Sequence, residues 1–162
     1  MSSRGLTLAC VLFFGVAVWS ACVGGGPPAN GANVGGERPG VNAAKTNAEE
    51  LALFVRLPYE TEDIVWKEFP TNKKLLAALR FSNADADKIG KECSTFGPAE
   101  SVSLPVETWF PEELVAQGEM SGDSALRGLA CPANSFFQEP YLSGRIARIE
   151  STDYFVLEVS AK

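Results

Sequence analysis

Residues 23–48 are the feature that most limits what this chain can fold into. They are rich in Gly, Ala, Asn and Pro and contain no Leu, Ile, Met, Phe, Tyr or Trp, so they cannot bury a core of their own. By the square-root rule for flexible chains, such a segment spans about 26–31 Å on average. Folding is therefore left to residues 49–162, which suffice for one small domain with a single core.

The segment in front of this linker has the pattern of a targeting sequence. Arg4 supplies a positive charge, residues 5–19 are uncharged and mostly apolar, and the small residues Ser20 and Ala21 precede Cys22. A membrane-spanning helix needs roughly 20 apolar residues, and glycine and proline follow here too soon to complete one. The pattern resembles a bacterial lipoprotein signal peptide. That resemblance implies removal of residues 1–21 and lipidation of Cys22.

Two alternatives compete with lipidation: cleavage after Ser20 to release an ordinary secreted protein, and an uncleaved anchor. The linker behind Cys22 favours lipidation, because a free secreted domain has little use for a tether. Two or more acyl chains on one cysteine would hold the chain at a bilayer, whereas one chain binds only marginally. The expected location is the bacterial cell envelope, with the domain outside the cytoplasm and the membrane as one partner.

The remaining cysteines of the expected mature domain, Cys93 and Cys131, could form a disulfide. Disulfides persist outside the cytoplasm, and closing a loop of 38 residues stabilises a fold by about 4 kcal/mol in the chain-entropy model. Two buried free thiols are the alternative. No Cys-x-x-Cys pair occurs, so neither a redox motif nor a zinc site is indicated.

The composition excludes several classes of function. The chain has no histidine and a net charge of −6, so it can form no Ser/His/Asp triad, Cys/His pair or His-ligated zinc site. An acidic surface without a basic stripe does not fit nucleic-acid binding. We expect no cofactor and no metal. Enzymes that need only two carboxylates remain open, with these candidates: Glu60, Glu62, Glu112, Glu113 and Glu119.

Alternating apolar residues predict an α+β domain with a largely antiparallel sheet of about five or six strands and two short helices. The expected strands cover residues 51–57, 63–69, 75–81, 101–106, 144–150 and 154–160. Ser82 is the expected N-cap of a helix over 83–94, and Pro111 begins the second helix. The last two strands form a hairpin in which the final strand, apolar on both faces, is central.

Aromatic residues suggest one contact surface. Phe136, Phe137 and Tyr141 lie among turn-forming residues in the loop 132–142, where an apolar patch would be exposed to a partner; filling the core is the alternative. We expect a non-catalytic envelope lipoprotein that binds a protein partner or serves assembly. The alternatives are a small histidine-free periplasmic enzyme and a small-ligand carrier. Two facing carboxylates in a cleft would favour the enzyme, and an enclosed apolar cavity the carrier.

Overall fold

The computed structural model describes residues 43–162. The predicted signal peptide, Cys22 and most of the predicted linker lie outside these residues. The elements, in chain order, are α1 (Ala48–Leu51), β1 (Thr61–Phe69), η1 (Pro70–Asn72), β2 (Lys74–Phe81), α2 (Asn83–Thr95), β3 (Glu100–Pro105), α3 (Glu112–Ser121), β4 (Ala125–Pro132), η2 (Asn134–Phe136), β5 (Tyr141–Ile149) and β6 (Tyr154–Ala161).

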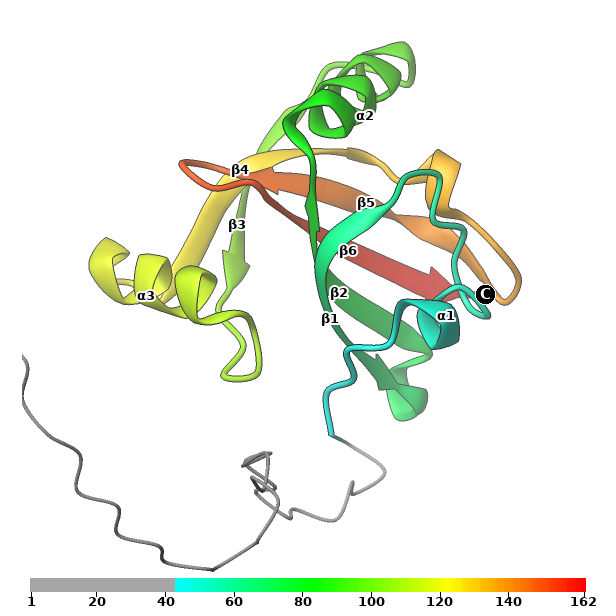
Figure 1. Cartoon of the computed structure of the whole chain (residues 1–162), viewed down its shortest axis with the longest axis horizontal. Coiled ribbons are helices and arrows are strands. Elements are labelled where there is room, and N and C mark those ends of the chain that lie inside the picture. The colour runs from blue at the N-terminus through cyan, green and yellow to red at the C-terminus, as the bar shows by residue number, and fades with distance from the viewer. Residues whose placement is uncertain (1–42) are drawn as a thin grey trace, which may run out of the picture. The chain divides into compact units, whose positions relative to one another are not determined.

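The strands form one antiparallel sheet in the order β1-β2-β6-β5-β4-β3 (Figure 1). The α+β class, the sheet, the two helices of more than one turn and the C-terminal hairpin β5–β6 are as the sequence predicted. Strand β6 pairs with β2 on one side and β5 on the other. This pairing confirms the predicted central position of the strand. The prediction depended on apolar residues on both faces, which are typical of a strand whose two faces are both covered.

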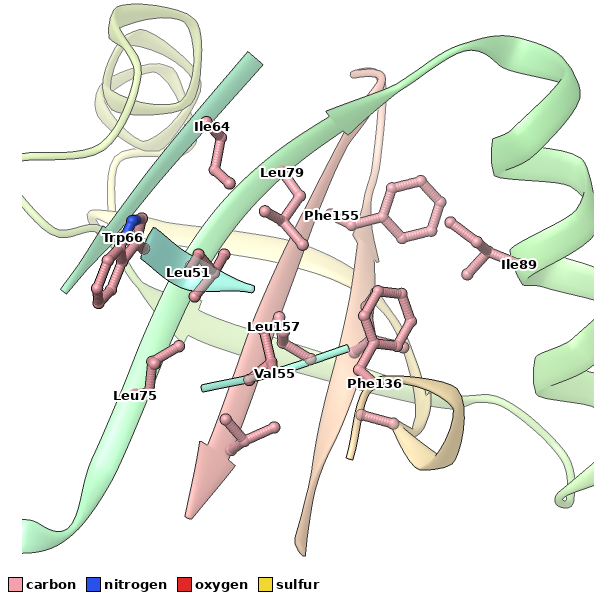
Figure 2. Close-up of a cluster of buried hydrophobic side chains, with 14 of the residues drawn as sticks. Leu51, Val55, Ile64, Trp66, Leu75, Leu79, Ile89, Phe136, Phe155 and Leu157 are labelled. Atoms are coloured by element: carbon pink, nitrogen blue, oxygen red, sulfur yellow. The ribbon is translucent and has the colours of Figure 1, made fainter. Parts of the chain in front are cut away.

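One face of the sheet, here called the α2 face, carries the larger apolar cluster. Figure 2 shows Leu79, Phe155 and Leu157 from the strands meeting Ile89 of α2 and Phe136 of η2. Strand residues two apart point to the same face, so the alternation of β2 and β6 places every second apolar residue here. Helices α1 and α2, η2 and the loop after α1 cover this face.

The opposite face, here called the α3 face, carries a second cluster. Leu114 of α3 and Phe110 in front of it pack on Ala78, Tyr154 and Val156. These strand residues alternate with those of the α2 face, as the pleat requires. In Figure 1, α2 and α3 accordingly lie on opposite sides of the sheet.

Helix α2 begins where the sequence predicted. The Ser82 hydroxyl accepts a hydrogen bond from the Asp85 backbone N–H at 3.2 Å and donates one to the Asp85 carboxylate at 3.0 Å. This cap satisfies an N–H that the helix itself leaves free. Lys88 pairs with the same carboxylate at 2.7 Å.

The strand predicted over 51–57 is wrong. The segment begins as helix α1 and continues in turns, with Val55 donating its N–H to the Leu51 carbonyl at 3.1 Å. Leu51 and Val55 are both fully buried, and their spacing of four fits a helical turn as well as a strand. The Asn47 side chain favours the helix, because as its N-cap it accepts a hydrogen bond from the Glu50 backbone N–H at 3.1 Å.

The folded domain begins before residue 49, so the predicted linker boundary at 48 is too late. Lys45 and Trp66 exchange two backbone hydrogen bonds, both at 2.8 Å. The Trp66 indole also donates to the Asn47 carbonyl at 3.1 Å, and the Lys45 ammonium lies 4.7 Å from the centre of its ring. These contacts cover part of the outer edge of β1, an edge that would otherwise be unpaired.

Strand β4 was not predicted. Its buried positions on the α3 face are Leu126, Gly128 and Ala130, and two of these have little or no side chain to carry a hydrophobic signal. Gly128 is required by packing, since a Cβ there would lie 2.3 Å from the Arg148 carbonyl oxygen. The strand is therefore determined by its neighbours β3 and β5 more than by its own composition.

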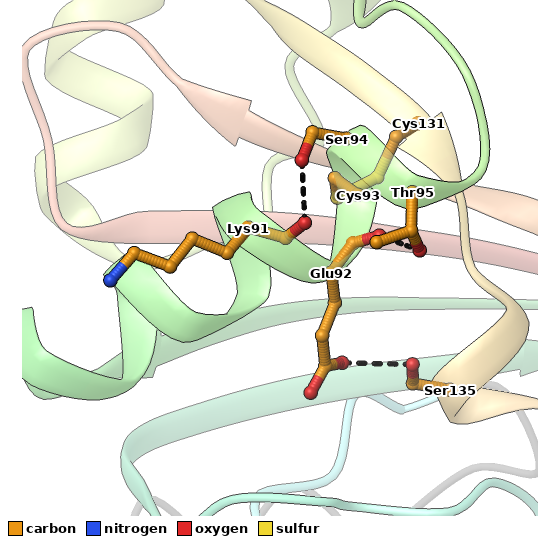
Figure 3. Close-up of a disulfide and its surroundings, with 7 residues drawn as sticks. All are labelled: Lys91, Glu92, Cys93, Ser94, Thr95, Cys131 and Ser135. Atoms are coloured by element: carbon orange, nitrogen blue, oxygen red, sulfur yellow. Dashed lines mark hydrogen bonds between the residues drawn. A yellow bond between two sulfur atoms is a disulfide. The ribbon is translucent and has the colours of Figure 1, made fainter.

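The disulfide predicted between Cys93 and Cys131 is present, with the two Cα atoms 5.5 Å apart. It joins the last turn of α2 to β4 (Figure 3). Across residues 43–162, none of the helices is long and apolar enough to traverse a bilayer.

Two glycines in helix interiors provide a test of how tightly each helix packs. A Cβ at Gly118 of α3 would lie 2.1 Å from Val106 Cγ2, whereas a Cβ at Gly90 of α2 meets nothing within 4 Å. We expect Gly118→Ala to lower the free energy of unfolding by about 1–3 kcal/mol through overpacking. Gly90→Ala, the control, should raise it by up to about 1 kcal/mol through helix propensity. Urea unfolding measures both, and equal effects would contradict this packing.

Candidate functional site

The contact surface predicted at the loop 132–142 is wrong for two of its three residues. Phe136 and Tyr141 are each only 2% exposed and belong to the cluster on the α2 face. Phe137 is half-buried and packs against the same cluster. The turn residues around these aromatics do not expose them, because η2 folds Phe136 back under α2.

The surroundings of the disulfide are a structural junction. Glu92 accepts hydrogen bonds from the Tyr59 hydroxyl at 2.5 Å and the Ser135 hydroxyl at 2.9 Å, and Figure 3 shows the second beside the disulfide. One carboxylate thus joins α2 to two loops. The hollow next to it holds only about 10 Å³, too little for a ligand larger than water.

A groove of about 230 Å³ lies on the α3 face, away from that junction. Its floor is formed by Leu76 of β2 and Val156 of β6. Leu104 of β3, Phe110, which precedes α3, and Phe69 at the end of β1 also line the groove. The groove is open because α3 covers only part of this face, next to β4.

A charged network lies at the mouth of the groove. Glu158 accepts a hydrogen bond from Arg145 Nε at 3.0 Å and one from Lys74 Nζ at 3.3 Å on its other oxygen. Arg145 Nη2 forms an ion pair with Glu158 at 2.9 Å. All three residues line the groove. The side chains of Lys74 and Arg145 remain 51% and 45% exposed, compared with 30% for Glu158, so both cations can reach a bound molecule.

The groove has few groups suited to chemistry. Its two carboxylates are Glu158 and Glu107, and Glu107 accepts the Trp109 indole N–H at 3.2 Å. Among the described residues no group of three or more Cys, Asp or Glu side chains could hold a metal ion. The carboxylates considered as catalytic candidates, Glu60, Glu62, Glu112, Glu113 and Glu119, are all exposed, and none lines the groove.

Sequence reasoning missed the groove, although one signal was present. Glu158 is the only charged residue in the apolar strand 154–160, and a charge on a central strand needs partners. Arg145 of β5 stands opposite Glu158, and Lys74 of β2 is two residues from Leu76, the residue opposite Glu158 on the other side. Their pairing depends on strand order, which no local pattern shows.

The three tyrosines each donate a hydrogen bond to a carboxylate: Tyr59 to Glu92, Tyr141 to Glu68 at 2.6 Å and Tyr154 to Asp63 at 2.5 Å. Burial and the hydrogen bond to Glu68 raise the pKa of Tyr141, and burial and the hydrogen bond to Asp63 raise the pKa of Tyr154. The hydrogen bond to Glu92 raises the pKa of Tyr59. Phenols held in this way are poor general bases.

No protein-family model matches this chain, and no curated protein or solved structure matches it either. The groove and its charged mouth are therefore the features from which a function has to be argued.

The raised tyrosine pKa values predict a late alkaline titration. We expect less phenolate at pH 10 in the folded protein than in a urea-unfolded control, measured by ultraviolet absorbance. Because the folded pKa values lie above the unfolded value of about 10, these groups stabilise the fold fully below pH 10, and this contribution is lost as the pH rises further. Coincident titration of the folded and unfolded chains would contradict the tyrosine–carboxylate contacts.

Proposed function

We propose that this chain is a bacterial envelope lipoprotein, anchored through Cys22, whose domain binds a protein partner in the groove on the α3 face. The observation that carries the proposal is an open apolar groove with two half-exposed cations at its mouth. An apolar centre with a polar rim is the usual anatomy of a protein–protein contact.

The size of the groove favours a protein partner over a carried ligand. Sites for whole small molecules usually measure about 300–1,000 Å³, and this groove holds about 230 Å³. That volume suits one large anchor side chain, the kind that dominates the energy of many interfaces. A carrier would also enclose its ligand, whereas this groove is open to solvent.

Two observations support the anchored location. The disulfide between Cys93 and Cys131 fits an oxidising compartment, and the residues before Cys22 have the pattern of a lipoprotein signal. Since Lys45 already pairs with Trp66, the proposed tether would comprise at most residues 23–44 and span about 23–28 Å on average. A partner would therefore meet the domain close to the membrane surface.

The groove does not favour a carboxylate enzyme. Such an enzyme needs one carboxyl group as acid and a second as base or nucleophile. In Glu158, both carboxylate oxygens are already engaged by cations, and Glu107 is bound to an indole. Both carboxylates of the groove thus already take part in side-chain contacts.

Lipidation is tested by substituting Cys22. We expect the wild-type chain to fractionate with membranes and its N-terminal peptide to carry acyl mass, because the acyl chains bury in the bilayer. Cys22→Ser should lose both, as measured by membrane fractionation and mass spectrometry. Cys10→Ser, a cysteine within the predicted signal peptide, is the matched control and should behave as wild type. Unchanged membrane association of Cys22→Ser would contradict the anchor.

The groove is tested by site-specific photo-crosslinking in cells. A photoreactive residue at Asn72, which lies exposed on the groove lining, should form an adduct with one protein. The same residue at Asn134, exposed in η2 and outside the groove lining, is the control and should not. Leu76→Trp fills the groove and should remove the Asn72 adduct, whereas Leu129→Trp, at an exposed position of β4 outside the lining, should retain it. Identical adducts from both positions, or one that survives Leu76→Trp, would contradict the proposal.

A further inference from the structure

The outer edge of β3 is open to a further strand. Strand β3 stands at one end of the strand order and pairs only with β4, as can be followed in Figure 1. The strand at the other end, β1, is partly covered, because Trp66 exchanges two backbone hydrogen bonds with Lys45. Within residues 43–162 no segment covers the outer edge of β3 in this way. Such an edge is a template on which another strand can pair.

The hydrogen bonds between β3 and β4 show which backbone groups point outward. Just beyond β3, Val106 donates its N–H to the Ser124 carbonyl at 3.1 Å. In an antiparallel pair, residues that bond the neighbouring strand alternate with residues whose N–H and C=O point the other way. The register with β4 is continuous, so the backbone groups of Ser101, Ser103 and Pro105 point outward. Because proline has no N–H, this edge offers two donors and three acceptors.

The middle of this edge lacks the usual protection against pairing. Natural proteins place charges or proline on exposed edge strands. In β3 these residues stand at the two ends, as Glu100 and Pro105, and residues 101–104 carry no charge. Ser101 and Ser103 are exposed, and their side chains are small enough for another backbone to approach. The edge can therefore accept a short strand over its central residues.

The same edge borders the groove. Leu104 lines the groove and belongs to the apolar cluster of the α3 face. Ser103 and Pro105 also line it, although their side chains alternate in direction with that of Leu104, so the edge of the strand itself lies beside the groove. Phe69, at the end of β1, lines it as well. Both edge strands of the sheet thus reach the groove, and a strand added to β3 would lie along it.

We propose that the partner in the groove binds as an extended segment that adds one further strand to the sheet at the outer edge of β3. This inference rests on the proposed function and specifies how the partner is recognised. The backbone of the segment would accept hydrogen bonds from the Ser101 and Ser103 N–H groups and donate to the outward carbonyls. In this mode of recognition, main-chain hydrogen bonds supply affinity, and side chains at alternate positions supply specificity.

The geometry of an added strand defines the partner's side chains. Residues directly opposite each other on neighbouring strands point to the same face. The partner residue opposite Leu104 would therefore point into the groove, and the residue opposite Val102 would lie beside it on the same face. The residue between them, opposite Ser103, would point to the other face, where Ser103 is exposed. The partner segment should thus alternate apolar and polar residues, with its largest apolar residue opposite Leu104.

A second copy of this chain is a poorer occupant of the edge. Full antiparallel overlap of two β3 strands places Pro105 of each copy opposite Ser101 of the other. Because proline cannot donate, one hydrogen bond is lost at both ends. The side chain opposite Leu104 would then be Val102, which is smaller than the large anchor proposed for the groove. The edge therefore favours a partner of different sequence.

The experiment uses two fluorescent peptides of one sequence, in which a central Phe and two Val alternate with Thr. One peptide is N-methylated on two Thr and the other on its two Val, so they differ only in which edge is blocked. Binding to the exported full chain carrying Cys22→Ser is measured by fluorescence anisotropy. With Phe in the groove, the Thr N–H groups face β3. We expect the peptide methylated on Val to bind at least about tenfold more tightly.

Amide hydrogen exchange measured by NMR identifies the edge that is used. The Ser101 and Ser103 N–H groups should become protected when the Val-methylated peptide is added, because they gain partners. Protection at Val102 and Leu104 should not change, since their N–H groups already bond β4. Unchanged exchange at both serines in the complex would contradict strand addition.

Substitutions at one position make the test specific. Ser103→Pro removes an outward N–H and places a ring at the edge, so it should weaken the Val-methylated peptide at least about tenfold. Ser103→Ala, the control, keeps the N–H and should bind like the unsubstituted chain.

Equal binding of the two peptides to the unsubstituted chain, or no binding of either, overturns the inference whether or not Ser103→Pro folds. A dimer of the chain alone that Ser103→Pro dissociates would also overturn it, because a second copy would then occupy the edge. If the Asn72 adduct forms while the peptide preference is absent, the partner occupies the groove without joining the sheet, and only this inference is wrong.

Discussion

The structure depends on one geometric constraint: a single short helix has to cover one face of a six-stranded sheet. Helix α3 has ten residues and is about 15 Å long, whereas six strands measure about 24 Å across. The opposite face has α1, α2, η2 and a disulfide to close it. On the α3 face the helix and Phe110 cover the region of Tyr154 and Leu126, and the strand residues beyond them form the floor of the groove. The groove thus follows from how little of this face the chain can cover.

The charged residues follow from the same constraint. A central strand carries Glu158 on the incompletely covered face, where water reaches it and where β2 and β5 each supply a cation. Half-exposed ion pairs of this kind add little to stability, so their main consequence is to fix the position of Lys74 and Arg145 at the edge of an apolar floor. In the function that we propose, a tether of about 23–28 Å would present this surface close to a bilayer. The proposed anchor and the groove are then compatible with one role, binding a partner at the membrane.

The sequence predicts more of the fold than of the candidate site. Alternation in β1, β2, β3, β5 and β6 and the Ser82 cap are local signals, and the structure confirms them. Local signals were misleading at Leu51 and Val55, because a spacing of four residues fits both a helix and a strand. They were weak in β4, because its buried residues Gly128 and Ala130 are too small to give a clear hydrophobic pattern. The groove could not be found in this way, because Leu76, Glu158 and Arg145 become neighbours only through the pairing β2-β6-β5. For Phe136 and Tyr141 the sequence leaves a contact surface and the core as alternatives, because turn residues surround them, and the structure places both in the core.

We propose that the α3 face, and not the α2 face, is the surface that binds the partner. The most direct measurement is chemical-shift mapping by NMR of the isotope-labelled chain carrying Cys22→Ser with the crosslinked partner protein added. We expect the perturbed resonances to concentrate at Leu76, Leu104, Phe110 and Val156. Perturbations concentrated on α2 and η2, with the groove residues unchanged, would contradict the claim.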